Sequence, residues 1–173
     1  MLMKSIVSIV VFLIAFEGIA LTVLPDTSLR ALFEKIDDPE KVEMEVFGFS
    51  DYERGAYTVF LKEKNSEQEV LLPIVIGGCE AIALSRQVAG EEFPRPLTYN
   101  LFCNMLDSMK IELKAVIISE LKNNTFYGII VLEQNGYRWE MDARPSDAMN
   151  LALRKKCKIF SYRKVIDAAG VKR

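Results

Sequence analysis

The chain has 173 residues, of which 50% are hydrophobic and 27% are charged, and its net charge is -2. This length and composition fit one folded domain, or one domain with an appendage, and argue against wholesale disorder. The chain contains 0 histidines, which excludes Ser-His and Cys-His nucleophilic pairs and histidine metal ligands. Acid–base chemistry must therefore use other side chains, and a metal held by carboxylates would be a hard ion such as Mg²⁺ or Mn²⁺.

Charge is distributed unevenly along the chain. Residues 26–70 carry 12 acidic and 6 basic side chains, whereas residues 148–173 carry 8 basic side chains and 1 acidic one. A basic end permits a polyanionic partner, although a solvated helix face would have the same composition. The three cysteines, Cys79, Cys103 and Cys157, form no CxxC motif, so neither a zinc ribbon nor a redox pair is indicated.

The amino-terminal segment differs from the rest of the sequence. Residues 6–24 contain one charge, Glu17, and follow Lys4, which is typical of a signal peptide or a membrane anchor. An ordinary buried helix is the alternative. We therefore expect residues 1–24 to anchor or export the protein, which would otherwise be cytoplasmic. Residues 25–40 are predicted to form a linker with a short helix, and residues 41–173 the globular domain.

The globular part alternates between strand and helix patterns. The predicted strands cover residues 41–49, 56–61, 69–76, 111–119, 125–132, 137–141 and 158–160. The predicted helices cover residues 79–88, 99–109, 145–155 and 162–168. Thr98 is expected to cap the second helix, whose apolar stripe would consist of Leu101, Phe102, Met105 and Leu106. This order predicts an α+β domain with a mixed, largely antiparallel sheet and helices packed on it.

One candidate site lies where the strand at 137–141 gives way to a helix. Asp142 ends the strand, and Asp147 falls in the first helical turn after Pro145, with Arg144 between them. Glu80 opens another helix and Glu120 ends another strand. Carboxylates near strand ends can hold Mg²⁺ for phosphodiester hydrolysis. The alternative is structural, because an acidic residue in a first helical turn is favoured by the helix dipole and Arg144 can pair with either aspartate.

A second candidate site lies around Arg95. Pro94 and Pro96 restrict the backbone on both sides, so the guanidinium is held in position. A fixed guanidinium suits phosphate binding, whereas the alternatives are a helix cap or an ion pair. Tyr99 and Tyr127 could stack on a base or sugar, or could simply pack as half-buried aromatic residues.

These motifs together resemble the bifunctional nuclease domain family. The resemblance spans about residues 41–170 and rests on four matching stretches, at residues 72–81, 94–98, 124–127 and 142–148. It implies an α+β domain that self-associates and a nuclease activity on DNA and RNA. The motif positions carried over are Glu80, Arg95, Thr98, Asp142, Arg144, Ser146 and Asp147.

The chain departs from the family pattern in two places. Many members have histidine after the Pro-Arg-Pro-Leu-Thr motif, where this chain has Tyr99. If that histidine were the general base, this chain would be weak or inactive. The hydrophobic amino terminus is the second departure.

The sequence thus supports two hypotheses. The first is a divalent-metal-dependent nuclease, in which Glu80, Asp142 and Asp147 hold Mg²⁺ or Mn²⁺ and act in catalysis. Phosphate-binding residues would be Arg95, Thr98, Arg144 and Ser146. The second is a non-catalytic, oligomeric binding or regulatory module, in which the same arginines and aspartates are structural. The modest net charge favours the second, because strong phosphate binding usually needs a more basic surface.

Overall fold

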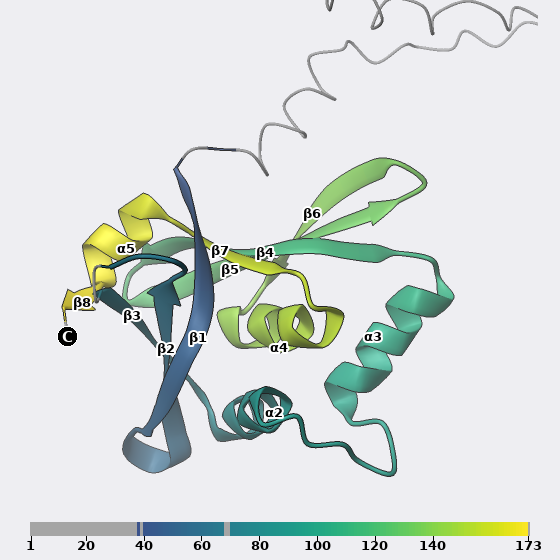
Figure 1. Ribbon diagram of the computed structural model, residues 1–173, viewed down its shortest axis with the longest axis horizontal. Helices are drawn as coiled ribbons and strands as arrows, with labels where there is room; N and C mark the ends of the chain where they lie inside the picture. Colours follow the sequence, from purple (N-terminus) through teal and green to yellow (C-terminus); the bar gives the residue numbers. More distant parts are fainter. Residues whose placement is uncertain (1–37, 39, 68–69, 173) are drawn as a thin grey trace, which may run out of the picture.

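The computed structural model describes residues 38, 40–67 and 70–172 (Figure 1). These residues form one sheet of eight strands: β1 (Lys41–Asp51), β2 (Ala56–Glu63), β3 (Val70–Gly77), β4 (Glu112–Lys122), β5 (Thr125–Gln134), β6 (Tyr137–Ala143), β7 (Lys158–Tyr162) and β8 (Val171–Lys172). The helices are η1 (Glu53–Gly55), α2 (Gly78–Val88), α3 (Thr98–Ser108), α4 (Pro145–Lys155) and α5 (Arg163–Ala169).

The sheet is mixed and largely antiparallel, which confirms the predicted α+β fold class. Its strand order is β6-β5-β4-β7-β1-β2-β3-β8, and only β4 and β7 run parallel among the pairs formed by the described residues. Such a parallel pair needs a crossover connection, and the chain between β4 and β7 includes α4. The two-residue β8, which pairs with Val70 and Leu71, was not predicted because so short a strand has no detectable alternation.

Two tight turns set the register of β4, β5 and β6. Asn123 and Asn124 have φ of 49° and 59°, and Asn135 and Gly136 have φ of 52° and 79°. Positive φ at both central residues is typical of the two-residue hairpin turns whose twist matches that of the strands. Asparagine and glycine tolerate this conformation best, so the sequence specifies both hairpins locally.

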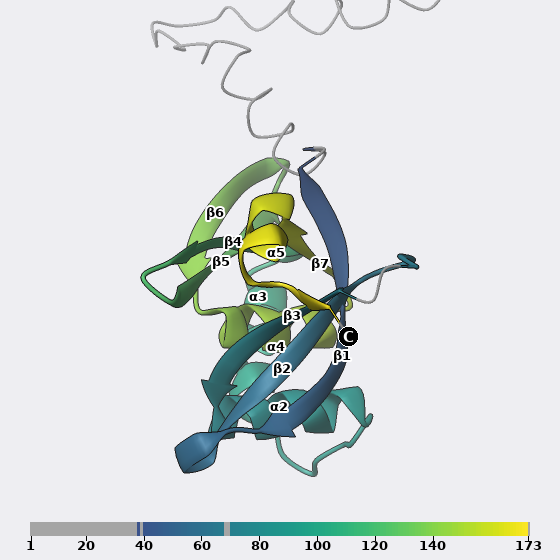
Figure 2. The same ribbon diagram turned by 90° about the vertical axis from the view of Figure 1, so that its left-hand side faces the viewer.

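Helix α4 lies at the centre of the fold. Figures 1 and 2 show the sheet curving around it, with β1, β2 and β3 on one side and β4 and β5 on another. Its buried face includes Ala148, Met149, Leu151 and Ala152. Helices α2 and α3 pack against α4. The start of α4 is therefore fixed by the sheet and by two helices.

The predictions for α3 are only partly correct. Leu106 is buried as predicted, but Leu101, Phe102 and Met105 are 56%, 40% and 52% exposed. Helix α3 contacts α4 and β4 and lies at the outside of the molecule in Figure 1, so the described residues leave most of its apolar stripe exposed. The predicted Thr98 cap is wrong: Leu97 occupies the N-cap position, and no side chain caps the helix.

The prediction of a membrane-anchored or exported protein requires correction. Along residues 38, 40–67 and 70–172, no helix is both long and apolar enough to cross a membrane. The segment behind the prediction, residues 1–24, lies outside the described residues, as does the short helix predicted within residues 25–40.

Candidate active site

Two glycines create the space in which the site is built. The side chain of Glu80 folds back over Gly77, where an added Cβ would lie 2.4 Å from Glu80 Oε2. The φ of Gly77 is -67°, so glycine is needed here for space and not for backbone conformation. Similarly, a Cβ on Gly128 of β5 would lie 2.8 Å from the carbonyl oxygen of Ala143. Gly128 therefore lets the chain cross β5 closely as it enters α4.

Arg144 joins the first turns of α2 and α4. Its Nε donates to Asp147 Oδ2 at 2.7 Å, and its Nη2 donates to Asp147 Oδ1 at 3.1 Å and to Glu80 Oε1 at 2.9 Å. The Arg144 side chain is 67% exposed, whereas those of Glu80 and Asp147 are 20% and 29% exposed. The hydrogen bonds to Asp147, above all, raise the pKa of Arg144 above its ordinary value. The guanidinium is thus a permanent cation beside two carboxylates.

Tyr99 of α3 completes the environment of Asp147. Its hydroxyl donates to Asp147 Oδ1 at 2.7 Å, and the Arg154 guanidinium lies over its ring at 5.2 Å from the centroid. Burial, followed by the hydrogen bond to Asp147, raises the pKa of Tyr99 well above its ordinary value. The phenol is therefore a neutral hydrogen-bond donor near neutral pH and cannot serve as a general base.

Buried polar groups hold the helices that carry Glu80, Arg144 and Asp147. Asn150 is fully buried, and its Nδ2 donates to the carbonyl oxygens of Glu80 at 3.0 Å and Ser146 at 2.9 Å. Its Oδ1 accepts from Arg154 Nη1 at 2.9 Å, while Arg154 Nη2 donates to the carbonyl of Ala83 at 3.1 Å. These bonds connect α4 to α2, so the carboxylates of both helices are held in a fixed relation.

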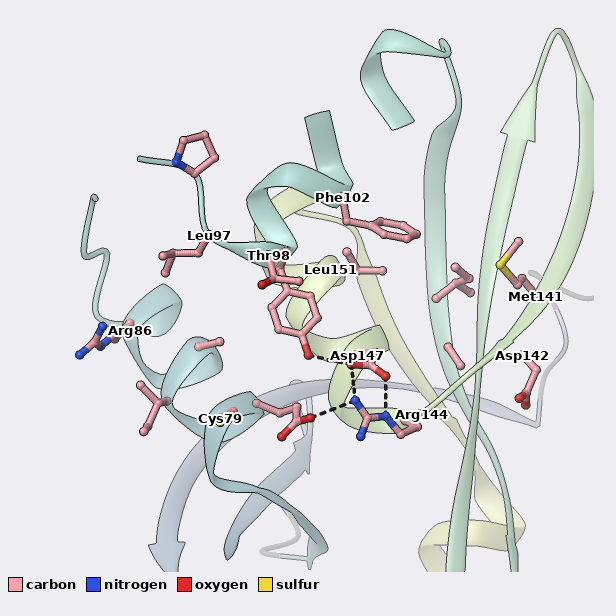
Figure 3. A pocket seen from close by; sticks show the side chains of 17 residues that line it. Cys79, Arg86, Leu97, Thr98, Phe102, Met141, Asp142, Arg144, Asp147 and Leu151 are labelled. Carbon is pink, nitrogen blue, oxygen red and sulfur yellow. Dashed lines mark hydrogen bonds and ion pairs between the residues drawn. The ribbon is translucent and has the colours of Figure 1, made fainter. Parts of the chain in front are cut away.

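A cavity of ≈ 870 Å³ opens beside the Arg144 cluster (Figure 3). Its polar lining consists of Glu80, Arg86, Thr98, Tyr99, Asp142, Arg144 and Asp147. The remaining lining is largely apolar and includes Ile82, Leu97, Phe102, Ile130, Met141 and Leu151. The cavity thus combines two arginines and three carboxylates with an apolar surface of the kind that contacts a base or sugar.

Comparison with known proteins identifies the family. The family model of the bifunctional nuclease domain matches residues 59–173. The chain belongs to the bifunctional nuclease domain family. The resemblance drawn from the sequence motifs is therefore confirmed.

Several relatives of this bifunctional nuclease domain are recognisable by sequence. An uncharacterized protein of Mycobacterium tuberculosis (strain ATCC 25618 / H37Rv) is 35% identical over 113 residues, which make up 65% of this chain and 66% of the relative. Bifunctional nuclease 1 of Oryza sativa subsp. japonica is 29% identical over 119 residues, 67% of this chain and 36% of the relative. Bifunctional nuclease 1 of Arabidopsis thaliana is 30% identical over 93 residues, 52% of this chain and 28% of the relative. The chain thus spans just under two thirds of the mycobacterial protein and about a third of the plant nucleases.

Within the bifunctional nuclease domain, most of the predicted site residues line the same cavity. These residues are Glu80, Thr98, Asp142, Arg144 and Asp147. Arg95 instead lines an adjoining hollow, and the buried Ser146 lines a third one that shares Arg144 with the cavity. Glu120 is exposed on β4 and lines none of these three hollows.

The carboxylates do not converge as a group of three. Figure 3 shows Asp142 apart from the Arg144–Asp147 pair, and within the part of the chain that the structure describes no three acidic or cysteine side chains are grouped to hold a metal. Glu80 and Asp147 are close, because both accept from Arg144 Nη2. Mg²⁺ is commonly held by one or two carboxylates together with waters and substrate phosphates. Two neighbouring carboxylates would thus suit an open Mg²⁺ or Mn²⁺ site completed by water and phosphate, whereas the described residues supply too few ligands here for a closed protein cage.

Sequence reasoning missed Asn150 and Arg154, and it did not assign Tyr99 its contact with Asp147. A signal for the first two was present. Asn150 is a polar residue flanked by Met149 and Leu151 in an otherwise apolar stretch, and Arg154 follows it one helical turn later. A buried asparagine must find hydrogen-bond partners, so this position could have been recognised as a structural centre of the site.

Proposed function

We propose that this bifunctional nuclease domain is a divalent-metal-dependent nuclease that hydrolyses phosphodiester bonds in DNA and RNA with low sequence specificity. The observation that carries the proposal is the meeting of Glu80, Arg144 and Asp147, from two distant parts of the sequence, at the wall of one large cavity. Family membership supports the same reaction class, since plant members of the family are named bifunctional nucleases.

Glu80 and Asp147 would hold Mg²⁺ or Mn²⁺. When bound, such an ion lowers the pKa of water and offsets the charge on the leaving oxygen. Both carboxylates sit in the first turns of helices, where the dipole favours negative charge. Asp142, at the edge of the same cavity, would act as a further ligand or would orient the attacking water.

Arg144 would bind the phosphate. Its Nη1 makes no hydrogen bond with the described residues, while Nε and Nη2 are held by Asp147 and Glu80. A guanidinium fixed on one side by carboxylates presents its free donors in a defined direction. Thr98, in the cavity lining, would add a hydroxyl donor to the same phosphate, and Ser146 would support the turn that carries Arg144.

The test is cleavage by the full chain of labelled single-stranded DNA and RNA with Mg²⁺, Mn²⁺ or EDTA. The Glu80→Gln/Asp147→Asn double variant should lose metal-dependent cleavage, by about 10²-fold or more. A matched control, Glu112→Gln/Asp167→Asn, removes the same charge from exposed residues that do not line the cavity and should cleave normally. Asp142→Asn measures the role of the third carboxylate separately. Equal activity in wild type and the Glu80/Asp147 variant would refute the proposed site.

A second candidate is a non-catalytic, oligomeric binding or regulatory module. It is favoured by the ion pairs through which Arg144 already neutralises both carboxylates, and by the exposed apolar side chains of Leu101, Phe102 and Met105 on α3. In this case the chain would associate through α3. Leu101→Ser/Met105→Ser should then shift the sedimentation equilibrium towards monomer, while no preparation would show metal-dependent cleavage.

A further inference from the structure

The cavity continues into a second hollow with different chemistry. This hollow, the polar groove, has a volume of ≈ 580 Å³ and shares Arg86 and Pro96 with the cavity. It is lined by the end of α2, the loop that joins α2 to α3, Asn100 and Asn104 of α3, and Arg154 of α4. Its principal polar residues are Arg86, Arg95, Asn100, Asn104 and Arg154. Three guanidiniums and two amides are a suitable set of donors for phosphate oxygens.

Arg95 is the least compensated of these cations. It is exposed, and it makes no ion pair or hydrogen bond with the residues that the structure describes. Pro94 and Pro96 restrict the backbone on either side of it, so the cost of ordering this part of the chain is reduced before an anion arrives. An ion pair among the described residues therefore does not explain its position, and its guanidinium is free to bind an external anion.

Arg154 also lacks a carboxylate partner among the described residues. Its Nη atoms donate to the carbonyl oxygens of Ala83 and Asn150 and to the side-chain oxygen of Asn150, which are all neutral acceptors. Its Nε is buried and has no hydrogen-bond partner among the described residues. The positive charge of Arg154 is thus not neutralised by a carboxylate, although it lies in the lining of the polar groove.

The groove also contains acidic residues that oppose anion binding. Glu91 and Glu92 belong to its lining, and Arg86 pairs with Glu91 at 3.7 Å. Both side chains of this pair are about half exposed, at 45% and 53%, so water screens the pair strongly. The pair is also longer than a hydrogen bond. A phosphate oxygen can therefore compete for Arg86, Arg95 has no competing partner among the described residues, and Arg154 adds positive charge to the groove lining.

We propose that the polar groove binds the backbone phosphates of a single-stranded nucleic acid while an adjacent unpaired base enters the apolar part of the cavity. This inference rests on the proposed function and specifies its substrate class. Phe102 and Met141 expose apolar surface to the cavity, and an unpaired base offers a face that can stack there. In a duplex that face is covered by its neighbours, and presenting it costs unstacking energy.

The first experiment measures binding of the full chain to a labelled single strand of about 12 nucleotides in EDTA, by fluorescence anisotropy from about 50 to about 200 mM salt. Arg95→Gln should weaken binding at least about threefold at the higher salt and reduce the slope of log affinity against log salt by about 0.7, because one phosphate contact is lost. Phe102→Ala should weaken binding without changing the slope, since stacking releases no counterions.

Lys172→Gln is the matched control. It removes one positive charge from the exposed strand β8, which lies at the opposite end of the molecule from α3 in Figure 1. This variant should bind like the wild type. The inference would be overturned if Arg95→Gln and Lys172→Gln had the same slope of log affinity against log salt. It would also be overturned if a duplex of the same sequence bound with equal affinity and depended equally on Arg95.

A second measurement separates this inference from the nuclease proposal. Cleavage of a small nitrophenyl phosphodiester by the wild type with Mn²⁺ requires the Arg144 cluster but not the polar groove, so it tests the nuclease proposal alone. Suppose that the protein does not cleave this ester, but Arg95→Gln still reduces the salt slope of strand binding. The groove assignment then stands and the nuclease proposal fails. If the protein cleaves the ester, but the wild type and Arg95→Gln show equal salt slopes of strand binding, the groove assignment fails and the nuclease proposal stands.

Discussion

The hydroxyl of Tyr99 donates a hydrogen bond to Asp147 Oδ1 at 2.7 Å. Arg144 donates hydrogen bonds to both oxygens of the same Asp147 carboxylate. One carboxylate of α4 is thereby fixed by a side chain from α3 and by the residue that caps α4. Because Arg144 also reaches Glu80 of α2, three helices meet at a single charged cluster. Any ligand that enters the cavity encounters groups whose positions are already determined.

Tyr99→Phe removes the hydroxyl while keeping the ring that contacts Arg154. We expect the free energy of unfolding to fall by about 1.5 to 3 kcal/mol, because a hydrogen bond to a charged, partly buried acceptor is lost. Urea denaturation measures the change. Tyr127→Phe is the matched control, since the Tyr127 hydroxyl makes no hydrogen bond with the described residues, and it should leave stability unchanged. Equal stability of the two variants would contradict the importance of this bond.

Tyr99 also predicts how stability depends on alkaline pH. Its pKa is raised in the folded protein, mainly by burial, so folding favours the protonated phenol. This contribution is complete below the ordinary tyrosine pKa of about 10 and is lost as the pH rises above it. Thermal unfolding followed from about pH 8 upwards should therefore show a decline above about pH 10 that is smaller in Tyr99→Phe. A decline of equal size in both proteins would show that other groups cause it.

The sequence predicts the scaffold better than it predicts the site. Local signals specify the hairpins at Asn123–Asn124 and Asn135–Gly136, and the apolar face of α4 follows from its periodicity. Contacts between elements that lie far apart in the sequence leave no comparable local signal. The sequence allowed Arg144 to pair with either Asp142 or Asp147, but nothing near Asp147 indicated that Tyr99 also reaches it, because that contact depends on how α3 packs against α4.

The same limitation explains the error in α3. Periodicity identified an apolar stripe, but it does not reveal how much of that stripe other elements cover. Leu106 faces the core, whereas Leu101 and Met105 lie beyond the edge of α4's contact with this helix. No signal in the sequence indicated that Arg95 lines the polar groove and not the cavity beside Arg144.

Gly77→Ala should disturb the site without disturbing the fold. The backbone of Gly77, with φ of -67° and ψ of 155°, suits alanine, but the new Cβ would lie 2.4 Å from Glu80 Oε2. The carboxylate must therefore move away. We expect a loss of Mn²⁺ affinity of about tenfold, which is of the size that displacing one ligand or its support produces, with circular dichroism unchanged.

Gly48→Ala is the control for this substitution. Gly48 lies in β1, and a Cβ added there meets no heavy atom within 4 Å. This variant should bind Mn²⁺ like the wild type in a calorimetric titration. If Gly77→Ala also binds normally, Glu80 is not part of the metal site.

Asn150→Ala tests the support beneath the carboxylates. Asn150 is fully buried and links Arg154 to the backbone of α2, so its removal leaves several buried polar groups without partners. We expect destabilisation of about 3 kcal/mol, measured by urea unfolding. Asn104→Ala, on the exposed face of α3, should change stability by less than about 0.5 kcal/mol. A similarly small effect of Asn150→Ala would mean that the network contributes little.

Arg144→Gln distinguishes a phosphate-binding arginine from a structural one. Without the guanidinium, Glu80 and Asp147 lose their countercharge, so the free protein should bind Mn²⁺ more tightly than the wild type does. Cleavage should nevertheless fall about 10²-fold, because the phosphate loses its charged donor. Calorimetric titration and a cleavage assay measure the two effects, and Arg138→Gln, which breaks a pair with Glu133 outside the cavity, is the control. Weaker Mn²⁺ binding, or an unchanged cleavage rate, would show that Arg144 serves only to join α2 to α4.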